Sequence, residues 1–188
     1  MPRANVFALL VLAVGLLAGC GDKPVPPTSA DRQQRYEAAK AIFEKASREF
    51  HMPSAQTRGS ERAKLEDQAA GLYADVAQSY ADQPIWAAQA LRSLGHIQAA
   101  RTNINEAVEL YAQVAEEFPQ QDFEVLMAWK SAGDLLSDAD TPVEAKVYYE
   151  KLLARFDKPD ALPIVKSVVR GAKARLSGEL LLSARDSQ

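Results

Sequence analysis

The stretch that decides the fold is AVELYAQVAEEF at residues 107–118, which is echoed by AKVYYEKLLARF at residues 145–156. In both, alanine, tyrosine, an aliphatic residue and phenylalanine follow one another at intervals of four, three and four residues. Residues at this spacing share one face of an α-helix. Each stretch therefore predicts an amphipathic helix that buries one small and three large side chains.

The same pattern occurs four times in the chain. The copies start at Ala39, Ala69, Ala107 and Ala145, and the last three starts are evenly spaced. Self-similarity at a fixed period indicates a repeat architecture, in which each unit buries its apolar face against its neighbours. The copies consist of Ala39, Phe43, Ala46 and Phe50; Ala69, Tyr73, Val76 and Tyr80; Ala107, Tyr111, Val114 and Phe118; and Ala145, Tyr149, Leu152 and Phe156.

A glycine stands twelve residues before the alanine in the last two copies, at Gly95 and at Gly133. Glycine inside a helix costs up to about 1 kcal/mol relative to alanine. Its use at both equivalent positions predicts that a partner helix carries the glycine and lies very close to the helix that follows it. The aromatic residue one turn after the alanine is expected to fill the space between neighbouring repeats.

This arrangement resembles the tetratricopeptide repeat (TPR), in which Trp or Leu, Leu-Gly, Ala, an aromatic, an apolar residue and Pro recur in register. The period here is about 38 residues, against about 34 residues in the family, and Gln120–Phe123 are expected to supply the extra turn. The matching residues are Leu91, Leu94, Gly95, Ala107, Tyr111, Val114 and Pro119 in one repeat, and Trp129, Gly133, Ala145, Tyr149 and Leu152 in the next.

The resemblance implies an all-α superhelix of antiparallel helix pairs, with about seven helices and a C-terminal capping helix. The best repeats cover residues 88–121 and 126–159. Asp31–Phe50 is expected to replace a missing first helix or to form an irregular first repeat, and Ile164–Leu182 is expected to be the cap. A generic helical bundle is the alternative.

Local signals suggest where helices start and stop. Thr141, Pro142 and Glu144 predict a capping box at the start of one helix. Asn105 and Ser60 are predicted to cap two others. The segment 51–59, which contains Pro53, is predicted to be a loop.

The N-terminus has the features of a processed leader. The apolar run Val6–Leu17 follows Arg3 and leads into Leu17-Ala18-Gly19-Cys20. It is long enough for a signal-peptide core and too short to span a bilayer, which takes about 20 residues. The order Leu-small-Gly-Cys resembles the lipobox of bacterial lipoproteins. The alternative is an ordinary secretory signal with a chance cysteine.

The lipoprotein resemblance implies a signal peptide at residues 1–19 and a lipidated Cys20. Pro24, Pro26 and Pro27 predict an extended tether at residues 20–30, and the helical pattern predicts a helical domain at residues 31–188. It also implies fatty acyl chains such as palmitate and a location on the periplasmic face of a membrane. Gly21 follows the cysteine directly and aspartate comes only at Asp22. In this family that order favours the outer membrane over the inner one.

The composition and the motifs argue against nucleic-acid binding, enzyme activity and metal binding. The formal net charge is −3 with mixed signs, which argues against a nucleic-acid binder. The sequence contains no phosphate-binding loop and no nucleophile elbow. His51 and His96 lack metal-ligand spacing, and the single cysteine, Cys20, is assigned to the lipid. We therefore expect no enzyme activity, no metal, no small-molecule substrate and no cofactor beyond the covalent lipid.

In the TPR family the first helices of the repeats line a groove. Arg92 and Lys130 fall on equivalent positions of adjacent repeats and are expected to read acidic side chains or a C-terminal carboxylate of a peptide. The alternative is that they are two ordinary exposed basic residues. Transferring the register gives six candidate groove residues: Gln89, Arg92, His96, Met127, Lys130 and Asp134.

The repeats are similar to those of envelope lipoproteins of the outer-membrane β-barrel assembly machine and of the Tol-Pal coordinator type. That similarity implies a membrane-anchored periplasmic scaffold that binds a protein or peptide partner during envelope assembly. Two alternatives stay open from the sequence. The chain is an adaptor for a cell-wall (peptidoglycan) enzyme, or it is a structural lipoprotein that self-associates through unfilled helix faces.

Overall fold

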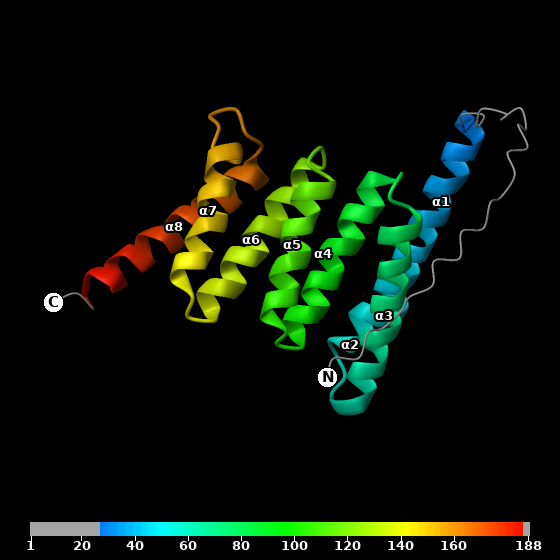
Figure 1. The fold of residues 1–188 in the computed structure, drawn as a ribbon, viewed down its shortest axis with the longest axis horizontal. Helices are drawn as coiled ribbons and strands as arrows, with labels where there is room; N and C mark the ends of the chain where they lie inside the picture. Colours follow the sequence, from blue (N-terminus) through cyan, green and yellow to red (C-terminus); the bar gives the residue numbers. More distant parts are fainter. Residues whose placement is uncertain (1–26, 186–188) are drawn as a thin grey trace, which may run out of the picture.

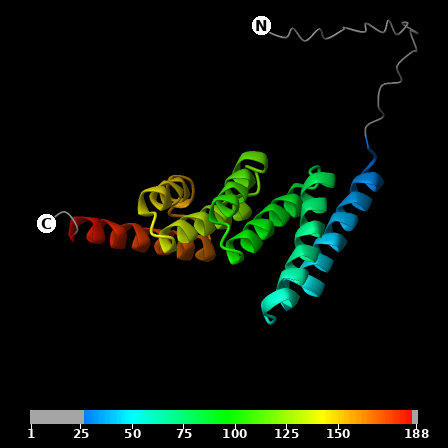
Figure 2. The ribbon, with the colours of Figure 1, turned by 60° about the horizontal axis from the view of Figure 1, so that its bottom comes forward.

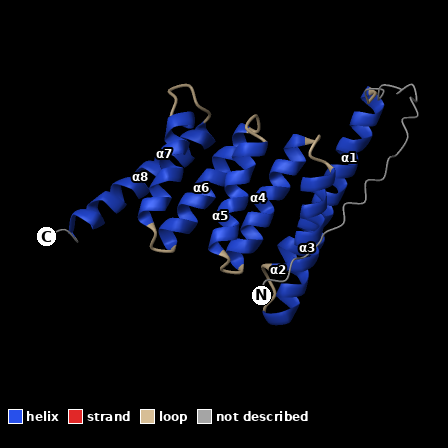
Figure 3. Cartoon of the chain, in the orientation of Figure 1, coloured by secondary structure: helices blue, strands red, loops and turns tan. Residues whose placement is uncertain are grey.

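The structure is a computed structural model and describes residues 27–185, all of whose regular elements are helical (Figures 1 and 3). The predicted signal peptide, Cys20 and most of the predicted tether lie outside the described residues. The elements are α1 (Ser29–Lys45), the π-helix η1 (Ala46–His51), α2 (Met52–Ser54), α3 (Gly59–Ser79), α4 (Pro84–Ala100), α5 (Ile104–Glu117), α6 (Asp122–Asp138), α7 (Pro142–Phe156) and α8 (Pro163–Arg185).

The helices form antiparallel pairs that stack side by side, as the repeat pattern predicts. Because α1, η1 and α2 follow one another without a break, residues 29–54 form one rod that pairs with α3. Helix α4 pairs with α5, α6 pairs with α7, and α8 packs on α7 and touches α6. Figure 2 shows α4, α6 and α8 in one layer with α5 and α7 in the other. The all-α superhelix of paired helices is confirmed.

The repeat period is visible in the helix boundaries. Helices α4 and α6 have the same length and begin at Pro84 and Asp122, and the two pairs therefore begin four residues earlier than the predicted repeats. The predicted extension at Gln120–Phe123 is only partly correct. Gln120 and Gln121 lie between α5 and α6, but Asp122 and Phe123 already belong to α6.

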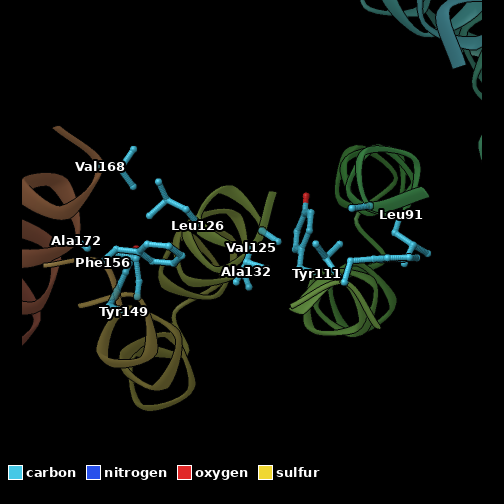
Figure 4. Close-up of a cluster of buried hydrophobic side chains, with 14 of the residues drawn as sticks. Leu91, Tyr111, Val125, Leu126, Ala132, Tyr149, Phe156, Val168 and Ala172 are labelled. Atoms are coloured by element: carbon cyan, nitrogen blue, oxygen red, sulfur yellow. The ribbon is translucent and has the colours of Figure 1, made fainter. Parts of the chain in front are cut away.

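The recurring aromatic residues form the core of the stack. Tyr73, Tyr111 and Tyr149 are each at most 1% exposed. Figure 4 shows Tyr111 between α4, α5 and α6, with Tyr149 and Phe156 between α6, α7 and α8. Burying one such side chain contributes about 1.5–3 kcal/mol, so the repeated pattern supplies much of the stability of each pair.

The two glycines explain how closely the helices of a pair approach. A Cβ atom on Gly95 would lie 2.5 Å from Cε1 of Tyr111, and one on Gly133 would lie 2.7 Å from Cε1 of Tyr149. Real Cβ atoms do not tolerate such distances, so each tyrosine ring occupies space that only glycine leaves free. The predicted close approach of the two helices is confirmed at both positions.

Helix α8 completes the stack at the C-terminal end. Val168, Val169 and Ala172 are buried against the rest of the stack, as Figure 4 shows for Val168 and Ala172. Gly171 stands one repeat period after Gly133, with nothing within 4 Å of its Cβ position. Helix α8 thus occupies the place of a first helix and confirms the predicted capping helix. No helix in the described part of the chain is both long and apolar enough to cross a bilayer.

The first pair departs from the sequence-based expectation. The copy that starts at Ala39 lies on the first rod, whereas the other three copies lie on second helices. The predicted loop at residues 51–59 is only partly correct, because the rod stays helical through Ser54 and the connection to α3 covers residues 55–58. In this pair, aromatic rings take the place that a glycine has in the later pairs. The ring centroids of Phe43 and His51 lie 5.2 Å and 5.7 Å from the ring centroid of Tyr73.

The turns inside the second and third pairs are alike and differ from the predicted caps. Thr102 and Asp140, which lie one repeat period apart, both have a positive φ, 63° and 59°. The residue that follows each donates its backbone N–H to a carbonyl five residues earlier, as in a Schellman turn.

The predicted capping box at Thr141 is wrong. Thr141 Oγ1 donates to the carbonyl of Leu136 at 2.8 Å, so this side chain closes α6 and does not cap α7. The predicted caps at Asn105 and Ser60 are wrong as well, because both residues already lie inside α5 and α3.

Replacing Gly95 by alanine should destabilise the fold, because the new methyl group must displace the Tyr111 ring. We expect a loss of about 1–3 kcal/mol in the free energy of unfolding, which is the usual cost of overpacking. Gly71 in α3 provides a matched control, since nothing lies within 4 Å of its Cβ position. There, alanine should stabilise by about 0.5–1 kcal/mol. Urea unfolding of both variants checks the prediction, and equal effects at the two sites would contradict it.

Candidate functional site: a polar row on the first helices

The six candidate groove residues lie where the register places them. Gln89, Arg92 and His96 are on α4, Met127, Lys130 and Asp134 are on α6, and all six are half-buried. The two helices are neighbours in the same layer (Figure 2). The structure therefore brings the six residues onto one side of the stack.

The buried tyrosines form hydrogen bonds through their hydroxyl groups to side chains on this side of the stack. Tyr111 Oη lies 2.8 Å from Nδ1 of His96. Tyr149 Oη donates to Oδ1 of Asp134 at 2.8 Å. His96 directly follows Gly95, and Asp134 directly follows Gly133. Each tyrosine therefore packs its ring against the glycine and hydrogen-bonds through its hydroxyl to the residue after that glycine.

Each pair is also linked to the one that follows it. The Tyr73 hydroxyl lies 3.1 Å from Nδ1 of His51, and the hydroxyl groups of Ser47 of η1 and Ser93 of α4 are close enough to lower its pKa by hydrogen bonding. Ser131 of α6, the residue equivalent to Ser93 in the next repeat, has the same effect on the Tyr111 hydroxyl. We call this set of groups the polar row. Its members are His51, Ser93, His96, Ser131, Asp134 and the hydroxyls of Tyr73, Tyr111 and Tyr149.

The two predicted cations of the groove already have carboxylate partners. Arg92 Nε lies 2.6 Å from Oε2 of Glu124, whose side chain is only 6% exposed. Lys130 forms an ion pair with Asp134 on its own helix. The sequence reasoning missed Glu124. It is distant from Arg92 along the chain, and no local spacing indicated the pairing.

His96 is neutral and its tautomer follows from its neighbours. Nε2 lies 3.1 Å from Nη1 of Arg92, and arginine has donors only, so Nε2 accepts and the ring proton sits on Nδ1. The Nδ1 hydrogen is then donated to Tyr111. Burial and the adjacent Arg92 charge lower the pKa of His96 to about 4.

His51, the second histidine, lies close enough to His96 to influence its pKa. The sequence gives no reason to link the two residues. Burial lowers the pKa of His51 below its usual value, and repulsion from the protonated form of His51 helps to lower the pKa of His96. Burial also raises the pKa of Tyr111 to about 12. These rings are therefore uncharged hydrogen-bonding groups at neutral pH.

The polar row runs from the buried tyrosine hydroxyls and Ser93 to the half-buried side chains of His51, His96, Ser131 and Asp134, which form its accessible part. Within residues 27–178, whose side chains the structure describes, no three His, Cys, Asp or Glu side chains gather as metal ligands would. The side chains come from three helix pairs and are fixed by core tyrosines. Such an arrangement is suited to recognition of another surface by shape and hydrogen bonding.

Comparison with known protein families, with curated proteins and with solved structures gave no significant match.

Removing Arg92 should be costly because it leaves Glu124 buried without a counter-charge. We expect Arg92→Ala to lower the free energy of unfolding by about 3 kcal/mol, whereas the double variant Arg92→Met, Glu124→Leu should lose much less. Lys146→Ala is the control, since its pair with Glu150 is exposed and such pairs contribute less than about 1 kcal/mol. Additive losses in the double variant would contradict the buried pair.

His96 should make stability depend on pH below neutrality. Its pKa is about 4 in the folded chain against an ordinary 6.5, so the unfolded chain takes up the proton first as the pH falls. The contribution of neutral His96 is complete above pH 6.5 and is lost between pH 6.5 and 4. Denaturant unfolding at several pH values should show a shallower loss in His96→Gln. The same slope in both proteins would contradict this assignment.

Proposed function

We propose that this chain is a TPR-like scaffold of the bacterial envelope, anchored by lipid on Cys20, which binds a protein partner on the layer of α4 and α6. The observation that carries the proposal is the polar row, which recurs from one helix pair to the next and is fixed from below by Tyr111 and Tyr149. On this proposal the chain itself is not an enzyme.

Prearrangement is what makes this surface suitable for binding. Association costs about 0.5–1.5 kcal/mol for each flexible side chain that becomes ordered at an interface. His96 and Asp134 are already held by tyrosine hydroxyls, and Arg92 by Glu124. A partner therefore meets a surface whose polar groups are ordered before contact.

Two features support the TPR and envelope parts of the proposal. The paired helices and the glycine–tyrosine contacts agree with the TPR resemblance, while the period of 38 residues is longer than the family's about 34. The lipobox-like Leu17-Ala18-Gly19-Cys20 supports a lipid anchor on the periplasmic face, and Gly21 after the cysteine favours the outer membrane. The first helix begins at Ser29, so eight residues, 21–28, separate the proposed anchor from the stack.

Site-specific photo-crosslinking in intact cells tests the proposed binding surface. A photoreactive amino acid at position 89 or 127 replaces a half-buried side chain of α4 or α6, and one at position 143 replaces the exposed Val143 of α7 as the control. We expect one and the same partner protein to be crosslinked from positions 89 and 127 but not from position 143. Adducts from all three positions, or none from the first two, would contradict the proposal.

The anchor has a separate test. Cys20→Ser should release the protein from the membrane fraction and abolish incorporation of labelled palmitate, because one lipidated residue supplies the whole attachment. Cell fractionation measures the first effect. Membrane retention of the serine variant would rule out the lipid anchor while leaving the binding surface untouched.

A further inference from the structure

A second candidate surface lies at one end of the third pair, where α6 begins, α7 ends and α8 begins. There the structure has an open cavity of about 300 Å³. Leu126 and Phe156, both buried, form its floor, and Figure 4 shows their side chains facing each other between α6, α7 and α8.

The rim of this cavity exposes large apolar side chains. Phe123, Leu162 and Ile164 are 50%, 67% and 54% exposed, and all three line the cavity. Only four other large apolar side chains of the described residues are exposed, and they lie on α2, α4 and α7. A gathering of exposed apolar residues around a hollow is typical of an interaction site.

The surface beside the cavity is basic, although the whole chain is acidic. Residues 155–175 contain six Lys or Arg against two Asp, while the chain carries a net −3. Arg155 and Lys173 are ion-paired with Asp122 and Asp157. Of the remaining cations, Lys158 lines both this cavity and a neighbouring hollow, and Lys166 and Arg170 line only the neighbouring hollow. None of the three has an ion-pair partner among the described side chains.

We propose that this cavity binds an acidic peptide segment of a partner protein. One bulky apolar side chain of the peptide enters the cavity over Leu126 and Phe156, and flanking carboxylates face Lys158, Lys166 and Arg170. The volume suits one aromatic or leucine side chain. A side chain can reach the sunken floor between three helices, whereas a bilayer surface cannot, so the shape favours a peptide over a membrane. This surface is separate from the polar row and does not depend on the function proposed for it.

Nuclear magnetic resonance titration of the isotope-labelled domain tests this inference. The probes are an acidic nonapeptide with one central phenylalanine, the same peptide with serine at the centre, and a version with lysine flanks. Vesicles containing phosphatidylglycerol form a fourth arm. We expect saturable binding of the first peptide only, with shifts at Phe123, Leu162 and Ile164.

Matched variants locate the binding. Leu162→Asp and Lys166→Glu should each weaken the acidic peptide by about tenfold, as expected for hot-spot residues. Val143→Asp and Lys146→Glu remove an exposed apolar residue and an exposed cation of α7 and should leave the affinity unchanged. Equal binding of the serine or lysine peptides, shifts elsewhere, binding to vesicles alone, or no binding at about 1 mM peptide would each overturn the proposal.

Discussion

A tyrosine ring resting on a glycine of the preceding helix is the contact on which the rest of the structure depends. At Gly95 and Gly133 the ring leaves no room for even one methyl group, so the two helices of the second and of the third pair are held at one separation and in one register. Because the same ring is buried on its other side by the next pair (Figure 4), a single residue type sets both the width of a pair and the stacking of pairs.

The same tyrosines connect the core to the surface. Each ring is buried, but its hydroxyl reaches the side of the stack where His51, His96 or Asp134 lies. Ser93 and Ser131 of the following pairs lie beside the hydroxyls of Tyr73 and Tyr111 and influence their pKa. The packing of the tyrosine rings inside the stack therefore determines how well the polar row is ordered. A change that loosens the tyrosine must also loosen the surface that we propose as the binding site.

The features visible in the sequence were those with a regular spacing. Helix faces follow from the spacing of apolar residues within a helix, and the glycine contacts and the capping helix follow from the repeat. Three features do not. Thr102 and Asp140 adopt a left-handed conformation that usually signals glycine or asparagine. Glu124 meets Arg92 only because α4 and α6 lie side by side. The cavity beside α8 is assembled from three separate helices. Such features depend on how elements are placed, and no single segment encodes them.

A double-mutant cycle between Gly95 and Tyr111 tests the glycine–tyrosine contact most directly. Alanine at position 95 is measured in the natural background and in Tyr111→Leu, which removes the ring but keeps an apolar side chain. If the ring is the reason for the glycine, Gly95→Ala should destabilise the natural chain. It should stabilise the leucine variant, by up to about 1 kcal/mol from helix propensity alone. The same loss of unfolding free energy in both backgrounds would contradict the contact.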